Sequence, residues 1–518
     1  MTSVRRKIAS HRPVVIVGSG LAGLSAAVRV AAHRDVVVVT KGALGEGSTG
    51  WAQGGIAAAL GPGDTVQAHA ADTLDAGAGL CERGAADAVC ADAPGVIADL
   101  AALGVAFDHD RGGIALAREG AHSLPRVAHA GGDATGRHVI EALALRVRRD
   151  PRITVIEHRR VDDLLVDGAG VHGVRLACGR VLEAAAVVLA TGGSGHLFAR
   201  TTNPLGATAD GPALARRAGA ALADMEMVQF HPTALAAGTS PLPLVSEAVR
   251  GAGGMLYDCH GESVMAGVHP MGDLGPRDVV ARAVYRRARE TGQDVVMSLA
   301  HLDPDRVRAR FPEVAALCAA HGIDLAQDPV PVTPAAHYGM GGVLTDLHGR
   351  TTVPGLWAVG ECACTGLHGA NRLASNGLLE AAALGRRAAD DVAHGGGAPA
   401  PGPRAEPTAF VPGDADGAAV RAAVARIMWQ DCGLERDAGG LHRAIAALDA
   451  LPRPADAEAA GLLDIARLTA LAALAREESR GAHFRTDFPE PDPAQAHRTC
   501  WTGDIPAAMP SIDLTEVA

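Results

Sequence analysis

The chain has 518 residues, carries a formal net charge of -11 at pH 7 and is 48% hydrophobic. That length is too great for one hydrophobic core, so we expect two or three domains. The acidic balance argues against a nucleic-acid partner, and no apolar stretch reaches the ~18 residues that a membrane span needs.

The nine cysteines are scattered and form no C-x-x-C pair, which excludes the common zinc and redox-dithiol motifs. We therefore expect reduced thiols, a cytoplasmic location and no metal site. Arg5, Arg6 and Lys7 precede an apolar run, as in a signal peptide. That run leads into a glycine-rich turn without an Ala-x-Ala cleavage site, so we expect neither secretion nor membrane attachment.

The first predicted elements are a strand, a turn and a helix. Val14–Val17 is an apolar run typical of a strand that is buried on both faces. Residues 18–23 have the G-x-G-x-x-G spacing, and an Ala-rich run at 21–33 has the length of a helix. Such a turn lets a pyrophosphate approach the positive end of the helix. Helix packing alone can use the same glycines, but the strand–turn–helix context favours dinucleotide binding.

A second buried strand is predicted at 36–40. An NAD-binding unit would have an acidic residue near its end to hold the ribose hydroxyls. Thr40 and Lys41 occupy that place, which lowers the case for NAD and leaves a different dinucleotide open. The glycine-rich segment 45–58 that follows is typical of backbone lying along a cofactor.

Helices and short strands follow. Periodicity predicts helices between 64 and 104 and in the second half of 117–143. Four β-like runs within 153–184, joined by glycine turns, favour a meander over a βαβ unit. A further buried strand, Val187–Ala190, ends in Thr-Gly-Gly, which leaves its carbonyl end open to a ligand. Asp210 starts a helix, where helix capping and cofactor contact are equally good interpretations.

The pattern loosens from about 225 to 331, which indicates an inserted domain with a basic helix beginning near Pro276. The nucleotide fold resumes at 356–390 with a strand, a glycine-rich loop and a long helix. A Pro/Gly-rich linker at 394–413 precedes further helical patterns, notably at 455–479.

Eight motifs stand in one order along the chain: GSGLAG, GSTGWAQGGIAA, REGAHS with DATGR, QFHPTAL, PRDVVARA, PAAHYGMGGV, LWAVGE and HGANRLASN. In order and spacing they closely resemble the flavoprotein family of succinate dehydrogenases, fumarate reductases and L-aspartate oxidases. The resemblance runs from about residue 14 to Glu490. It implies an α/β fold, with a Rossmann-like FAD-binding domain, an inserted α+β capping domain and a C-terminal helical domain. The implied boundaries are 1–223 and 332–397 for the FAD-binding domain, 224–331 for the capping domain, and 398–518 for the linker and helical domain.

The resemblance also implies one FAD per chain, held by residues of the glycine turn, the glycine-rich segment and the later Gly-Glu and helix-start motifs. These are Ser19, Gly20, Leu21, Ala22, Lys41, Ser48, Thr49, Gly50, Trp51, Ala52, Gln53, Gly54, Gly55, Val161, Asp210, Glu361, Gly377 and Leu378. The family often has serine where this chain has Gly377, so one hydroxyl contact to the flavin is in doubt.

Oxidation of a C4 dicarboxylate requires both carboxylates to be fixed beside the flavin. His231 and His337 can each donate to a carboxylate, and Arg372 can do so through two nitrogens. Ser246 supplies a hydroxyl where many relatives have threonine. A lone histidine is more often structural, but His231 and His337 lie in family motifs, and the resemblance assigns these four residues to the substrate.

Arg277 corresponds to the family's proton-shuttling arginine. Its charge alone would make it a surface residue at a helix start, and a guanidinium is a poor base because its pKa exceeds ~12. The role therefore rests on the resemblance alone. Pairing of Arg277 with a nearby carboxylate such as Glu247 is expected to place that glutamate at the substrate site.

Two positions at which this chain departs from the family pattern indicate which members of the family it resembles most. Succinate dehydrogenase flavoproteins and membrane-bound fumarate reductases link FAD covalently through a histidine, whereas the corresponding run here is Gly47-Ser48-Thr49. Those enzymes also carry an apolar aromatic residue where this chain has Glu119, which suits a substrate with an ammonium group. A solvated loop residue is the alternative interpretation of Glu119.

We therefore expect non-covalent FAD and oxidation of L-aspartate to iminoaspartate, the first step of quinolinate and NAD biosynthesis. Dioxygen or fumarate is the expected electron acceptor, and a quinolinate synthase is the expected recipient in a transient hand-off. One alternative is a soluble fumarate reductase or succinate dehydrogenase flavoprotein subunit. Another is an interaction subunit that passes electrons to an iron–sulfur partner in a membrane complex.

Overall fold

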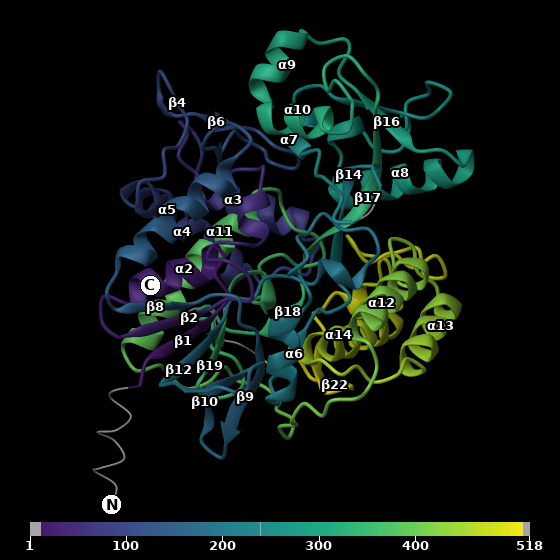
Figure 1. Ribbon diagram of the computed structural model, residues 1–518. Coiled ribbons are helices and arrows are strands. Elements are labelled where there is room, and N and C mark those ends of the chain that lie inside the picture. The colour runs from purple at the N-terminus through teal and green to yellow at the C-terminus, as the bar shows by residue number, and fades with distance from the viewer. Residues whose placement is uncertain (1–11, 239, 511–518) are drawn as a thin grey trace, which may run out of the picture.

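The computed structural model describes residues 12–238 and 240–510. Arg5, Arg6 and Lys7, considered above as the start of a signal peptide, lie outside these residues. Figure 1 shows three regions: a sheet with helices at the N-terminal end of the colour scale, a teal region above it, and a yellow group of helices beside it.

The first region is built on a five-stranded parallel sheet. Its strand order is β19 (Leu356–Ala358), β12 (Ala186–Leu189), β1 (Val14–Val17), β2 (Val36–Val39) and β8 (Ile153–Ile156). The predicted strand at 14–17 is confirmed residue for residue, and β2 and β12 each end one residue early. The α/β fold class is confirmed.

The prediction for β8 is wrong. The run at 153–156 does not belong to the meander but pairs in parallel with β2, after a crossover through α5 (Thr135–Arg149). Only β9 (Val161–Asp167), β10 (Gly170–Leu176) and β11 (Val181–Glu183) form the antiparallel meander. A four-residue apolar run has the same sequence pattern in either kind of sheet.

Successive side chains of a strand point to opposite faces of the sheet, so alternate residues of the parallel strands belong to two separate cores. Val14 and Ile16 belong to a core shared with helices on one face, and Val15 and Val17 to a core shared with the meander on the other. The helices are α2 (Leu21–Val30), α3 (Val66–Ala76), α4 (Arg83–Ala102), α5 and α11 (Asn376–Ala393). The first helix ends at residue 30, three residues before the predicted end.

Short strands connect these helices. β3 (Ile56–Ala57), β6 (Leu116–Ala117) and β7 (Val127–Ala128) form one small sheet, and β4 (His109–Asp110) pairs with β5 (Gly113–Ile114). The glycine-rich segment 45–58 contains β3 and lies beside α5, whose residue Gly136 donates its N–H to the carbonyl of Ala52 at 3.0 Å.

The teal region in Figure 1 has its own sheet and core. The sheet order is β14 (Val228–Leu235), β17 (Val330–Gly339), β16 (Val295–Ser298) and β15 (Met255–Tyr257). Its helices are α7 (Glu247–Gly251), α8 (Arg277–Thr291), α9 (Pro304–Arg310) and α10 (Pro312–Ala319). β14 and β17 pair antiparallel along most of their length, so that β14 begins where β17 ends, with Val228 opposite Gly339.

The C-terminal helices are α12 (Gly417–Asp431), α13 (Ala438–Asp449) and α14 (Ala457–Ala475). They share a hydrophobic core with α6 (Asp210–Arg217) and the meander. A second five-stranded sheet lies beside them, in the order β20 (Ala363–Cys364), β18 (Gly342–Leu344), β13 (Leu222–Ala223), β21 (Cys500–Thr502) and β22 (Ile505–Ala507).

The described residues contain neither a membrane-spanning helix nor a metal-binding cluster. Among residues 12–238 and 240–510, no helix has both the length and the apolar character needed to cross a bilayer. The same residues contain no group of histidine, cysteine, aspartate and glutamate side chains arranged to hold a metal ion.

Gly18 gives a test of the turn on which the first region depends. Its φ is +114°, and an added Cβ would lie 2.1 Å from the carbonyl oxygen of Ala190. Gly179 has a comparable φ of +82° with nothing within 4 Å of an added Cβ. We expect Gly179→Ala to cost about 1 kcal/mol through backbone strain, and Gly18→Ala to cost roughly a further 1–3 kcal/mol through the clash.

Thermal unfolding of the two variants and of the wild type measures how much stability each substitution costs. A Gly18→Ala protein as stable as the Gly179→Ala protein would show that the close approach of these backbones is dispensable.

Candidate active site

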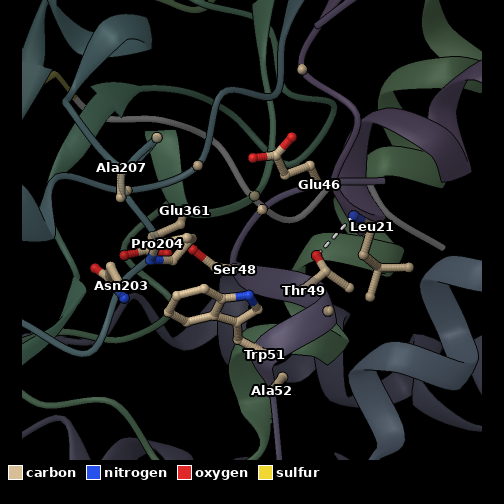
Figure 2. A pocket seen from close by; sticks show the side chains of 18 of the residues that line it. Leu21, Glu46, Ser48, Thr49, Trp51, Ala52, Asn203, Pro204, Ala207 and Glu361 are labelled. Carbon is tan, nitrogen blue, oxygen red and sulfur yellow. Dashed lines mark hydrogen bonds between the residues drawn. The ribbon is translucent and has the colours of Figure 1, made fainter. Parts of the chain in front are cut away.

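A cavity of about 1000 Å³ lies at the carboxyl end of the parallel sheet. Its walls come from the glycine turn after β1, the segment 46–53, the segment 202–207 and the start of α11. Loop residues 241–244 and part of α10, which belong to the teal region of Figure 1, form a further wall of the cavity. Figure 2 shows the Trp51 indole extending into this space, with Asn203, Pro204 and Glu361 across from it.

The glycine turn brings backbone to the cavity wall. An added Cβ at Gly23 would lie 2.3 Å from the carbonyl oxygen of Gly18, so helix and strand pack closer than a larger residue allows. Gly20, the N-cap residue of α2, has no side chain with which to cap the helix. The Leu21 N–H donates to Thr49 Oγ1 at 3.0 Å, as Figure 2 shows. The positive end of α2 therefore faces the cavity.

A second helix start faces the same cavity. Ser375, the N-cap residue of α11, has a φ of +62°, and its hydroxyl donates to Glu119 Oε2 at 2.7 Å instead of capping its own helix. Gly377 and Leu378, in the first turn of α11, line the cavity. Two helix N-termini thus place partial positive charge on one enclosed space.

Several buried polar atoms of residues that line the cavity lack hydrogen-bond partners among the described residues. Within the part of the chain that the structure describes, Gln53 Oε1 and Thr191 Oγ1 make no hydrogen bond. Gln53 Nε2 donates to the carbonyl oxygen of Leu244 at 2.8 Å, which fixes the amide and leaves its oxygen for another group. Because buried polar atoms are normally paired, these atoms, the glycine cradle and the helix ends fit a dinucleotide that carries a polar ring system.

Lys41 meets two carboxylates at the cavity wall. Its Nζ lies 2.6 Å from Asp210 Oδ2 and 2.8 Å from Glu458 Oε1, and it donates to Thr208 Oγ1 at 2.7 Å. Burial alone would lower the pKa of Lys41, but the two carboxylates raise it above its ordinary value. Asp210 is therefore a partner of Lys41 and the first residue of α6, not its cap, which is Ala209.

Glu361 faces the cavity from the end of β19. Burial raises the pKa of its carboxyl to about 7, against the opposing effect of the Gly339 N–H, which donates to Oε1 at 3.0 Å. A carboxyl with this pKa can accept a hydrogen bond or donate one near neutral pH.

The predicted cofactor residues are gathered at this cavity with two exceptions. Gly54 and Gly55 are not among its lining residues, and the others are. Gly55 instead serves backbone packing, since an added Cβ there would lie 2.3 Å from the carbonyl oxygen of Ala128.

Two of the predicted substrate residues, His337 and Arg372, also line the cavity. His231 is buried next to them, its ring centroid 5.1 Å from that of His337. Burial, followed by nearby positive charge, lowers the pKa of both imidazoles well below the ordinary value. The Thr233 N–H donates to His231 Nδ1 at 3.2 Å, so neutral His231 carries its proton on Nε2 as a free donor.

Arg277 is buried, with 9% of its surface exposed, and the surface interpretation of this residue is wrong. Its Nε donates to Glu247 Oε2 at 2.5 Å, and its Nη1 to Gln229 Oε1 at 3.1 Å. Arg250, one turn along α7, lies 3.9 Å from the same carboxylate. Burial would raise the pKa of Glu247, but Arg277 and Arg250 lower it to about 2, so Glu247 is ionised at neutral pH.

Ser246 and Glu119 lie close to this pair. In the described ranges the buried hydroxyl of Ser246 has no partner. Glu119 is 7% exposed, with Oε1 3.8 Å from His129 Nε2. An added Cβ at the next residue, Gly120, would lie 1.9 Å from Glu247 Oε1. Glu119 is therefore a buried residue of the same cluster, although it is not among the residues that line the cavity.

Sequence reasoning missed Gln229 and Tyr338. Gln229 Oε1 accepts from both Arg277 and Arg372, at 3.1 and 3.3 Å, and the Arg372 guanidinium lies over the Tyr338 ring at 4.5 Å from its centroid. Both residues lie in the quoted motifs, close to His231 and His337, and this position could have indicated that they belong to the site.

Comparisons with known proteins cover nearly the whole chain. The family described as "FAD binding domain" matches residues 13–378, and the family described as "Fumarate reductase flavoprotein C-term" matches residues 421–518. The L-aspartate oxidase of Agrobacterium fabrum is 49% identical over 95% of this chain and 94% of its own. That of Streptomyces coelicolor is 47% identical over 92% of this chain and 89% of its own.

Solved structures give the same picture. The FrdA chain of a variant E. coli quinol fumarate reductase matches with a TM-score of 0.85 and 30% identity, covering 94% of each chain. Sdh1 of Mycobacterium smegmatis matches with a TM-score of 0.76 and 31% identity, covering 93% of this chain and 89% of that one.

The Glu247 ion pair predicts a pH-dependent stability. Its pKa is about 2 in the folded protein against an ordinary 4.5, so its contribution is present above about pH 4.5 and is lost as the pH falls toward 2. Glu247→Gln should lower the free energy of unfolding by roughly 3 kcal/mol or more at pH 7, because two buried guanidiniums lose their counter-ion.

Denaturation between pH 7 and pH 3 should show that the difference in free energy of unfolding between wild type and Glu247→Gln becomes smaller below pH 4.5. Glu262→Gln is the control, because Glu262 is an exposed partner of Arg287 with 71% of its side chain accessible. If the difference in free energy of unfolding between wild type and Glu247→Gln stays constant over this range, the ion-pair account is contradicted.

Proposed function

The chain belongs to the flavoprotein family of succinate dehydrogenases, fumarate reductases and L-aspartate oxidases, and we propose that it oxidises L-aspartate to iminoaspartate. The carrying observation is its 47–49% identity, over nearly the whole chain, to L-aspartate oxidases of two organisms. FAD is its cofactor, and this bound flavin supplies the acceptor for the electron pair. The reaction starts quinolinate and NAD biosynthesis, with dioxygen or fumarate as the final acceptor.

The proposed substrate contacts follow from charge. A C4 dicarboxylate brings two negative charges to a buried site in which Arg372 has no carboxylate partner among the described residues. Arg372 would pair with one carboxylate, and His337 and His231 would donate to the other. Ser246 would add its hydroxyl. The neutral imidazoles suit this task because they donate without adding charge.

The proposed proton carrier is Arg277. Conversion of aspartate with an α-ammonium to the neutral imine removes a hydride from C2 and two protons from nitrogen, whereas fumarate reduction adds a hydride to one alkene carbon and a proton to the other. Arg277 reaches the site from the start of α8, and Glu247 and Gln229 fix two of its nitrogens. Ionised Glu247 would keep Arg277 in place and would accept a proton from the guanidinium as Arg277 takes one from the substrate.

Glu119 would set the choice of substrate. The α-ammonium of aspartate distinguishes it from succinate and fumarate, and an ammonium in a closed pocket loses several kcal/mol of solvation unless an anion faces it. Glu119 is a buried carboxylate one residue from the contact with Glu247. We assign the ammonium to it.

Small molecules are the partners of this enzyme. We further propose a transient hand-off of iminoaspartate to a quinolinate synthase, and a cytoplasmic location, supported by nine free cysteines. The proposed domains are 1–223 with 332–397 for FAD, 224–331 for the cap and 398–518 for the linker and helices. β17 crosses the 331/332 boundary and joins the cap to the FAD-binding domain.

We expect the FAD to be non-covalent. Ser48 stands where the covalently flavinylated relatives have histidine, and its side chain faces the cavity (Figure 2). Acid or heat precipitation of the purified yellow protein should therefore leave all of the flavin in the supernatant. Yellow colour that remains with the washed pellet would contradict this expectation.

The substrate assignment predicts that aspartate bleaches the flavin under anaerobic conditions and that succinate does so far more slowly. Glu119→Gln keeps the side-chain shape and removes the charge. The kcat/KM for aspartate should then fall roughly ten- to a hundredfold, the range of a lost charge-assisted bond.

Fumarate reduction with an artificial donor is the internal control, because fumarate has no ammonium group and its rate should stay within a few-fold. Equal losses for aspartate and fumarate would show that Glu119 supports α11 through Ser375 and does not select the substrate. Faster bleaching of the wild type by succinate than by aspartate would favour the succinate dehydrogenase alternative.

A further inference from the structure

Arg372 is poorly held by direct contacts. Its Nη1 donates to the carbonyl oxygen of Leu373 at 3.4 Å and its Nη2 to Gln229 Oε1 at 3.3 Å, and its Nε has no hydrogen bond to any described residue. Burial and the neighbouring positive charge of Arg277 lower the pKa of Arg372 to about 10. A guanidinium in such a place needs another source of stabilisation and of orientation.

The Tyr338 ring supplies a flat surface for it. The guanidinium carbon lies 4.5 Å from the ring centroid, within the range in which the negative face of an aromatic ring attracts a cation. The start of α11 packs closely against both groups, since an added Cβ at Gly377 would lie 3.1 Å from Tyr338 Cε2 and 3.4 Å from Arg372 Nη1. The absence of a side chain at 377 therefore gives the pair its room.

The far side of Tyr338 is anchored to a buried charge. Its hydroxyl donates to Glu380 Oε2 at 2.8 Å, and His368 Nε2 lies 2.8 Å from the same oxygen. Thr365 donates to Glu380 Oε1 at 3.4 Å. Burial would raise the pKa of Glu380, but His368 and Tyr338 lower it, so the carboxylate is ionised. Hydrogen bonding to an anion polarises the phenol and strengthens the negative face of the ring.

We propose that Tyr338 is a positioning residue that fixes the plane and charge of the Arg372 guanidinium for a substrate carboxylate. Glu380 and His368 hold Tyr338 in turn. One α11 residue, Glu380, thereby supports the substrate site from the same helix whose first turn faces the cofactor. This inference rests on the proposed role of Arg372 as a carboxylate anchor.

The test measures fumarate binding to the oxidised holoenzyme by the perturbation of the flavin spectrum, since fumarate cannot be oxidised. Loss of a desolvated cation–π pair should raise the Kd for fumarate roughly ten- to thirtyfold in Tyr338→Leu. Tyr338→Phe keeps the ring but not the bond to Glu380, and should raise it roughly two- to fivefold. Glu380→Gln should give a loss of the same order as Tyr338→Phe.

Tyr285→Leu is the matched control, because Tyr285 of α8 also lies under a guanidinium, that of Arg289 at 5.5 Å, away from the cavity. Its Kd for fumarate should equal that of the wild type. FAD content and thermal unfolding are measured for each variant, so that a fumarate effect is compared at equal cofactor loading.

A double-mutant cycle separates positioning from general support. If Tyr338 acts through Arg372, adding Tyr338→Leu to Arg372→Lys should weaken fumarate binding much less than it does in the wild type. A fumarate Kd for Tyr338→Leu within twofold of the wild type, or fully additive losses, would overturn the inference. If Tyr338→Leu loses FAD, an unchanged Kd for Tyr338→Phe overturns it. A normal Kd for Arg372→Leu would instead overturn the proposed substrate site.

Discussion

Three buried guanidinium groups lie beside the cavity, two of them paired with one carboxylate and the third, that of Arg372, without a carboxylate partner among the described residues, and this excess of positive charge dominates the site. Arg277, Arg250 and Arg372 are each less than 10% exposed, and Glu247 is the anion between the first two. Burying unpaired charge is costly, so the protein keeps the neighbouring imidazoles neutral and the glutamate ionised. A dicarboxylate, the proposed substrate, would offset this charge on binding. The same excess explains why an aspartate-specific site also needs a negative group for the ammonium.

Helix α11 links this charged site to the cofactor cavity. Its first turn lines the cavity through Gly377 and Leu378, and Glu380 one turn later supports the ring beneath Arg372. Its N-cap, Ser375, contacts Glu119. Because α11 packs along α2, whose own N-terminus faces the cavity, the two helix starts are held together at one wall of the cavity. Gly385 of α11 permits this close packing, since an added Cβ there would lie 2.6 Å from the carbonyl oxygen of Ala22.

The sequence predicted what is local. The apolar run at 14–17, the glycine turn and the start of α2 are set by neighbouring residues, and the structure agrees with them. The pairing of β8 with β2 depends on a crossover of more than a hundred residues, and no local pattern distinguishes it from a meander. Asp210 was placed at a helix start, but its partner Lys41 is 169 residues away in the chain. The burial of Arg277 likewise depends on Gln229 of β14 and Glu247 of α7, which only the fold brings together.

The contact between Glu119 and Ser375 has a consequence for substrate choice. Ser375 holds a left-handed backbone conformation that few non-glycine residues adopt, and its hydroxyl is bonded to the proposed ammonium-binding carboxylate. A neutral Ser375 hydroxyl occupies one carboxylate oxygen and leaves the other, 3.8 Å from His129, for a cation. Glu119 is thereby held by a neutral hydroxyl and not by an arginine or lysine. An arginine or lysine in place of Ser375 would neutralise it, whereas a hydroxyl orients it, and orientation with retained charge is what selection of an ammonium requires.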